Sequence, residues 1–178
     1  MKSRRRVSLL QSLSKWDCSD LKEFTVVSKS PENTLKLGIN IGSVSKPGDV
    51  ICLEGKLGTG KTVFVNGIAR GLGFNGPVRS PTFIIINLIP EIRLCHVDAY
   101  RLDDSEALIS LGIEEFLDGD WICVVEWAEK VSEALPEERL WVRIGFTEVD
   151  SQRKIAFFPS ELWLERIEKI RKQVGNEY

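Results

Sequence analysis

The clearest chemical signature in the chain is one glycine-rich segment, Gly55 to Thr62. It fits the pattern G-x-x-x-x-G-K-[ST] at every fixed position. In such a loop the backbone N–H groups and a lysine ammonium surround the phosphates of a nucleotide, and the last hydroxyl binds Mg²⁺. We therefore predict that Lys61 contacts the β- and γ-phosphates and that Thr62 is a metal ligand. A glycine-rich turn with a chance lysine is the alternative.

Two carboxylates follow apolar segments that have the pattern of strands. Glu126 comes directly after the run 121–125, and Asp98 comes directly after the run 92–97. Open α/β sheets bind ligands beyond the carboxyl ends of their strands, so we expect both acids near the phosphates. One acid can hold the metal while the other orients the water that attacks the γ-phosphorus. A solvated charge at a strand end remains the alternative for each.

Other candidates are less specific. The hydroxyls of Ser80 and Thr82 are predicted to sense a γ-phosphate or its metal, although a simple turn before a strand has the same pattern. His96 alternates with apolar neighbours, which favours a hydrogen-bonded core histidine over a catalytic one. Arg79 and Arg101 can supply charge to a transition state, but surface ion pairs explain either arginine equally well.

The elements that must position these groups alternate between short apolar runs and helical patterns. Expected strands cover 24–28, 49–54, 83–89, 92–97, 121–125, 140–146 and 154–158. Expected helices cover Pro31 to Lys46, 61–72, pieces of 103–118, 127–134 and the segment after Ser160. This order predicts an α/β fold, a P-loop NTPase-like three-layer sandwich with a mixed, mainly parallel central sheet.

Composition and length limit the class of protein. The 178 residues suit one domain at 23–178, including a C-terminal helix, preceded by a basic extension at 1–22. A net charge of −2 and a pI near 5.6 disfavour direct tRNA binding by this chain alone. The four cysteines lack C-x-x-C spacing, and no apolar run approaches the roughly 18 residues that span a bilayer. We therefore expect a cytoplasmic protein that does not enter a membrane.

Four segments in this order closely resemble the TsaE (YjeE) family. They are LEGKLGTGKT at 53–62, SPTF at 80–83, HVDAYRL at 96–102 and EWAE at 126–129. The resemblance runs from about Thr34 to Arg153. Lys56 stands where the family has an aspartate, Ala99 where it has a larger apolar residue and Ala128 where it has a proline, but none of these changes removes a group with assigned chemistry.

The resemblance implies a weak Mg²⁺-dependent ATPase of the bacterial machinery that makes N6-threonylcarbamoyladenosine (t6A) at position 37 of tRNAs. It implies that ATP contacts the loop, with Mg²⁺ held by Thr62 and Glu126, and that Asp98 serves hydrolysis. The cofactor would contact Thr34, Gly58, Thr59, Gly60, Lys61, Thr62, Val63 and Trp127. The partner implied is the TsaB–TsaD heterodimer, and tRNA would be reached only through that complex.

Three other functions fit parts of the sequence. A small-molecule kinase could use the same loop, although no arginine-rich lid segment is present. A GTP switch lacks support because the chain has neither an N-K-x-D motif nor a D-x-x-G motif. A nucleotide-sensing scaffold without turnover would use Glu126 and Asp98 only for binding.

Overall fold

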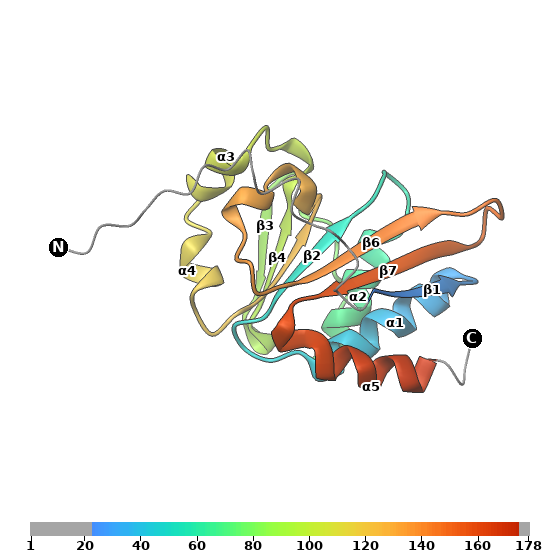
Figure 1. Ribbon diagram of the computed structural model, residues 1–178. Helices are drawn as coiled ribbons and strands as arrows, with labels where there is room; N and C mark the ends of the chain where they lie inside the picture. The colour runs from blue at the N-terminus through green and yellow to red at the C-terminus, as the bar shows by residue number, and fades with distance from the viewer. Residues whose placement is uncertain (1–22, 175–178) are drawn as a thin grey trace.

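A seven-stranded mixed sheet organises the protein, with the strand order β1-β7-β6-β2-β5-β4-β3 (Figure 1). The computed structural model describes residues 23–174, so the predicted extension at 1–22 lies outside the described residues. The four central strands run parallel: β6 Leu140–Phe146, β2 Val50–Glu54, β5 Ile122–Glu126 and β4 Leu94–Asp98. The sheet continues beyond β6 with β7 Arg153–Pro159 and then β1 Phe24–Ser28, and beyond β4 with β3 Ile86–Ile89. Each of these strands pairs antiparallel with its neighbour.

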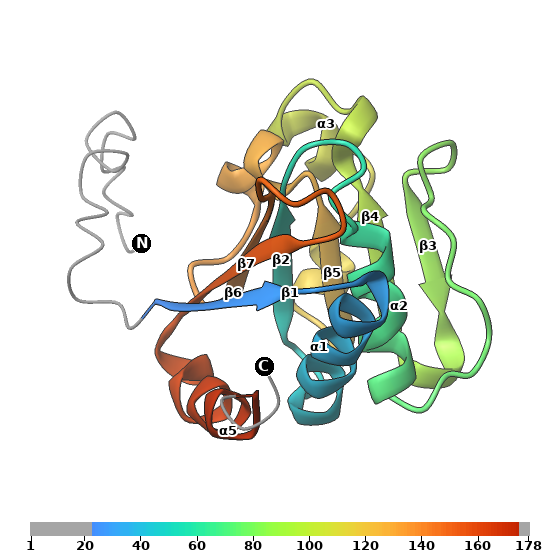
Figure 2. The same cartoon turned by 90° about the vertical axis from the view of Figure 1, so that its right-hand side faces the viewer.

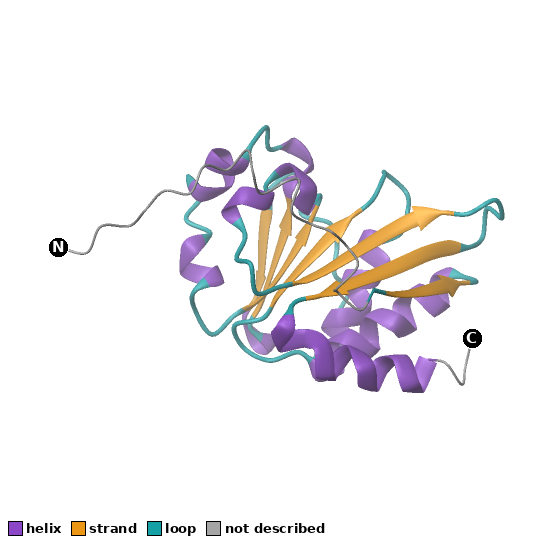
Figure 3. Cartoon of the chain, viewed as in Figure 1, coloured by secondary structure: helices purple, strands orange, loops and turns teal. Residues whose placement is uncertain are grey.

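Helices cover both faces of this sheet, which gives three layers (Figure 3). One face carries α1 Pro31–Val44, α2 Lys61–Gly71 and α5 Leu164–Val174. The other carries the shorter α3 Ser105–Ile109 and α4 Glu114–Leu117, together with several 3₁₀ turns. A separate cluster of buried apolar side chains fills each interface. The predicted α/β three-layer architecture is confirmed, with the parallel pairing confined to the middle of the sheet.

The contact between α1 and α2 is unusually close, and glycines make it possible. A Cβ on Gly38 would lie 2.3 Å from the carbonyl oxygen of Phe64 and 2.9 Å from Cα of Gly67. At the start of α1, Ser30 caps the helix by accepting a hydrogen bond from the N–H of Asn33 at 3.3 Å. Because α2 begins inside the phosphate loop, this packing fixes the position of the loop against α1.

Two expected elements differ from the structure. The strand expected at 83–89 begins only at Ile86, because the N–H groups of Ile84 and Ile85 both bond to the carbonyl of Pro81 and coil the chain into a turn. The helix expected at 127–134 is two short 3₁₀ turns, Ala128–Lys130 and Ser132–Ala134. Val131 between them is fully buried with φ −127° and ψ 23°, so a helix cannot run through it.

The remaining expected elements are present. The run expected at 121–125 is β5, in which every residue is buried, and the hairpins β3–β4 and β6–β7 are antiparallel as predicted. Within residues 23–174, helices long and apolar enough to cross a membrane are absent.

Candidate functional site

The glycine-rich loop connects β2 to α2, as the sequence predicted. Its backbone needs glycine: Gly60 has φ 101°, a left-handed conformation, and a Cβ on Gly55 would lie 2.3 Å from the carbonyl oxygen of Ile144. Because Gly60 directly precedes Lys61, the first residue of α2, the open N–H groups of the helix face the loop. This arrangement suits an anion at the N-terminus of α2.

Lys61 lies inside the loop. Its Nζ donates hydrogen bonds to the carbonyl oxygens of Gly55 at 2.6 Å and Lys56 at 3.1 Å, and it lies 3.8 Å from the ring centroid of Trp127. Burial lowers the pKa of Lys61, and the nearby carboxylates of Glu126, Glu129 and Asp98 partly oppose that shift. The ammonium is therefore poorly hydrated, and phosphate oxygens could replace its carbonyl partners.

Glu126 and Thr62 face each other across the end of the sheet. The Thr62 hydroxyl lies 3.1 Å and 3.2 Å from the two carboxylate oxygens of Glu126. On the other side, Nε2 of His96 lies 2.9 Å from Oε1 of Glu126. His96 is fully buried, and its Nδ1 has no hydrogen-bond partner among the described residues. The predicted core histidine is therefore in the core, and it also holds the carboxylate.

Asp98 is the last residue of β4 and lies beside Glu126, the last residue of β5, in the parallel register. Both side chains are almost completely buried, with each residue 3% exposed. Oδ2 of Asp98 accepts hydrogen bonds from the hydroxyls of Ser80 and of Thr82, the latter at 2.7 Å, while Oδ1 accepts from the N–H of Tyr100 at 3.0 Å. The tertiary fold thus brings the predicted switch hydroxyls onto the predicted hydrolytic acid.

Thr34 and Trp127 border the loop from two sides. Thr34 is buried on α1, its hydroxyl lies 2.8 Å from that of Ser28, and its methyl lies 3.8 Å from where a Cβ on Gly60 would be. Trp127 has a left-handed backbone, φ 59°, and its ring packs against Tyr100 with centroids 5.1 Å apart.

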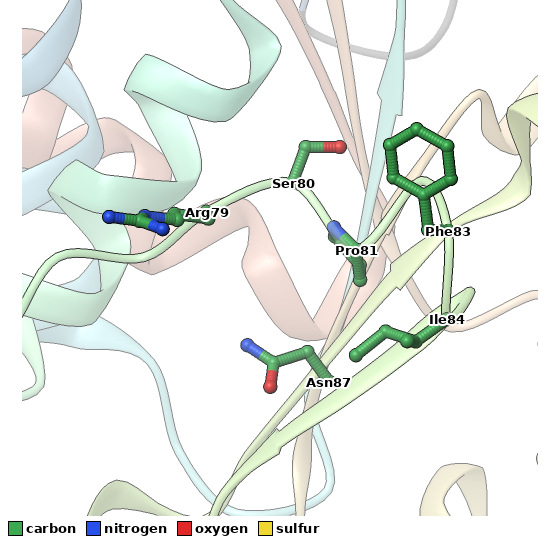
Figure 4. A pocket seen from close by; sticks show the side chains of 6 residues that line it. All are labelled: Arg79, Ser80, Pro81, Phe83, Ile84 and Asn87. Atoms are coloured by element: carbon green, nitrogen blue, oxygen red, sulfur yellow. The ribbon is translucent and has the colours of Figure 1, made fainter.

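Arg79 and Arg101 both lie near Phe83. The guanidinium of Arg101 stacks on the exposed ring of Phe83 at 4.6 Å. Arg79 lines a hollow (Figure 4), together with Ser80, Pro81, Phe83, Ile84 and Asn87. The residues of the phosphate loop take no part in lining this hollow.

The sequence model of the family described as threonylcarbamoyl adenosine biosynthesis protein TsaE matches residues 28–155, which include every candidate residue above. The chain belongs to the TsaE family.

Individual TsaE proteins show the same similarity. A tRNA threonylcarbamoyladenosine biosynthesis protein TsaE of Bacillus subtilis is 40% identical over 139 residues, covering 77% of this chain and 86% of the relative. The TsaE protein of Treponema pallidum is 39% identical over 130 residues, covering 72% of this chain and 96% of the relative. A crystal structure of Bacillus subtilis YdiB superposes with a TM-score of 0.74 at 34% identity, covering 86% of this chain and 97% of that one.

The donor set of this TsaE protein fits Mg²⁺ bound together with a nucleotide. Mg²⁺ is commonly held by one or two protein oxygens and completes its shell with phosphates and water. Thr62 and Glu126 supply one hydroxyl and one carboxylate that already touch. Among residues 23–174, groups of three or more His, Cys, Asp or Glu side chains able to hold a metal by themselves are absent. Binding of Mg²⁺ would therefore require a bound nucleotide.

Sequence reasoning missed two contacts that shape this TsaE site. Glu54, at the end of β2, accepts hydrogen bonds from Nε1 of Trp141 at 2.8 Å and Nε of Arg143 at 2.9 Å. Arg153 at the start of β7 donates to carbonyl oxygens of the phosphate loop. The partners are up to 95 residues apart and belong to no motif, so the sequence contains no local signal for them.

Proposed function

We propose that this TsaE protein binds and slowly hydrolyses ATP with Mg²⁺, as the ATP-consuming component of tRNA t6A37 modification. Its partner would be the TsaB–TsaD heterodimer, and tRNA would be reached through that complex. The observation that best supports nucleotide chemistry is the buried Lys61 ammonium in a glycine loop, next to the Thr62–Glu126 pair. The proposed activity is supported by the family and by this donor set, and the proposed partner by the resemblance to the family.

In the proposed mechanism, the loop amides from Gly58 to Val63 and the ammonium of Lys61 bind the phosphates. Thr62 and Glu126 would hold Mg²⁺, which offsets negative charge on the phosphate oxygens when bound. Thr34 and Trp127 would flank the nucleotide, since both border the loop.

Asp98 would orient the attacking water and accept its proton, because Glu126, beside Thr62, would be used by the metal. The carboxylate of Asp98 is itself engaged by Ser80 and Thr82. Freeing Asp98 therefore requires this pair of hydroxyls to move, which gives the Ser80–Thr82 segment the role of a switch. Slow hydrolysis without a partner follows from this engagement.

The cysteines within residues 23–174, Cys52, Cys95 and Cys123, are free and buried, which is typical of a reducing compartment and supports a cytoplasmic location. We also propose that residues 23–178 act as one ATPase domain with 1–22 as an extension.

The decisive experiment measures phosphate release from ATP by the purified protein, alone and with the TsaB–TsaD pair, using Lys61→Ala as the inactive control. We expect slow release that the pair accelerates and that the control lacks. Equal rates for wild type and control would refute the proposal. Product analysis separates it from the kinase alternative, because a kinase yields a phosphorylated metabolite in place of free phosphate.

A further inference from the structure

Arg153 ties the β6–β7 hairpin to the phosphate loop. Its Nε donates to the carbonyl oxygen of Thr59 at 3.2 Å, and its Nη2 lies 3.4 Å from that of Gly58. Its Nη1 donates to the carbonyl oxygens of Asp150 at 2.6 Å and Gln152 at 2.7 Å, within the hairpin connection. In Figure 2 this connection lies in front of the loop between β2 and α2.

The hairpin also fixes the orientation of the guanidinium. The ring of Phe146, at the end of β6, lies 4.7 Å from the guanidinium carbon of Arg153. A planar guanidinium stacked on a ring and bonded to two hairpin carbonyls has little rotational freedom left. The donors that face the loop are therefore already in place before any ligand binds.

The acceptors of Arg153 determine where the loop amides point. In a trans peptide the carbonyl oxygen of one residue and the N–H of the next point in opposite directions, and cis peptides are absent from the described residues. Gly58 O faces Arg153, and the N–H of Thr59 on the same peptide points into the loop, where it donates to Lys56 O at 3.3 Å, an acceptor that a phosphate oxygen would replace. By the same geometry, the bond to Thr59 O directs the N–H of Gly60 inward.

We propose that Arg153 is a positioning residue that holds the phosphate loop from outside, so that its amides face the phosphates. The inference rests on the proposed nucleotide site and adds a residue remote from its motifs. Four of the five N–H groups of Arg153 face carbonyl oxygens, so Arg153 acts chiefly through the loop. Loss of the hydrogen bonds from Arg153 to the loop should lower the affinity for every ligand that the loop amides bind, for ADP as much as for ATP.

The test compares Arg153→Gln and Arg153→Lys with wild type and with Arg139→Gln. The control arginine directly precedes β6, also stacks on a ring and also donates to backbone carbonyls, but these belong to Ser132, Leu135 and Pro136, at the other end of β6 from the hairpin connection. Calorimetry with Mg²⁺ gives the affinities for ADP and ATP. Hydrogen exchange of the loop amides in nucleotide-free protein gives a readout independent of the ligand.

We expect Arg153→Gln to lose roughly tenfold in affinity for both nucleotides, which is the effect of about one net hydrogen bond to a charged donor. Loop amides should exchange faster while those of β5 stay unchanged. Arg153→Lys should lose less affinity and less amide protection than Arg153→Gln but should not reach wild-type values. A single ammonium cannot reproduce the planar, forked set of N–H donors of a guanidinium. Arg139→Gln should leave the loop exchange at the wild-type rate.

Two results would overturn the inference. One is unchanged affinity and unchanged loop exchange in Arg153→Gln. The other is loss of hydrolysis with both affinities retained, which would mean that the guanidinium serves the transition state. If wild type binds neither nucleotide, the proposed function fails, whereas the exchange measurement still decides whether Arg153 holds the loop.

Discussion

The hydroxyl of Thr62 and the carboxylate of Glu126 are in direct contact, although 64 residues separate them in the sequence. Thr62 is in the first turn of α2 and Glu126 ends β5, so the contact joins the helix that follows the phosphate loop to the centre of the sheet. A cation bound with the nucleotide would find both oxygen ligands in place.

Replacing Glu126 by glutamine should reduce the effect of Mg²⁺ on nucleotide affinity by roughly tenfold or more, because a neutral amide is a poor Mg²⁺ ligand. Nucleotide affinity without Mg²⁺ should stay close to wild type. Titration of ATP with and without Mg²⁺ checks this. Glu133→Gln, at an exposed position seven residues further on, is the matched control and should behave as wild type.

His96→Leu should lower the free energy of unfolding by about 1–3 kcal/mol, because it leaves the buried carboxylate of Glu126 without one hydrogen-bond partner. The same substitution should also reduce the effect of Mg²⁺ on nucleotide affinity. His96→Gln places an amide nitrogen near the position of Nε2 and should recover part of both losses. Chemical denaturation measures the stability, and equal values for the two variants would contradict the positioning role.

Asp98→Asn should slow ATP hydrolysis by roughly a hundredfold or more, the usual effect of losing a general base. ATP affinity should stay within a few-fold of wild type, because Asp98 contacts Ser80 and Thr82 and not the loop. Phosphate release and calorimetry measure the two quantities. Asp103→Asn, an exposed neighbour, should leave both unchanged. A parallel fall in affinity and rate would indicate a binding role.

Gly38→Ala should destabilise the protein by about 1–3 kcal/mol, because the added methyl group meets the backbone of α2 and not a movable side chain. Gly145→Ala is the control, since its Cβ would have no neighbour closer than 4.0 Å. Thermal unfolding should show a lower midpoint for the first variant only. Similar midpoints for both would show that α1 and α2 can move apart at little cost.

Alkaline pH should destabilise the fold through Cys52. Burial raises the pKa of its thiol from 9.0 to about 12. Between these values the folded protein keeps a proton that the unfolded chain loses, so the free energy of unfolding falls as pH rises, by about 1 kcal/mol per pH unit. Cys52→Ala should show a shallower fall in denaturation measured from pH 8 to 11. Identical slopes for wild type and Cys52→Ala would contradict the assignment of this pH dependence to the Cys52 thiol.

Much of the fold was predictable because its signals are local. The apolar run of β5, the Ser30 cap of α1 and the loop before α2 each depend on neighbouring residues. The segment at 83–85 was predicted wrongly as strand, since its apolar residues suit a sheet. In the structure, the hydroxyls of Ser80 and Thr82 bind Asp98, and the chain between them and β3 turns. At this segment the hydrogen bonds to Asp98, at the end of β4, override the local preference for a strand.

The sequence by itself determined the phosphate loop, its lysine and its hydroxyl, because eight adjacent residues contain that chemistry. It also indicated acids at strand ends, without showing which groups they would meet. Only the tertiary structure decided that Glu126 lies between Thr62 and His96, that Asp98 is bound by two hydroxyls, and that Arg153 holds the loop. These contacts depend on strand order and register, which bring distant segments together and which no local pattern specifies.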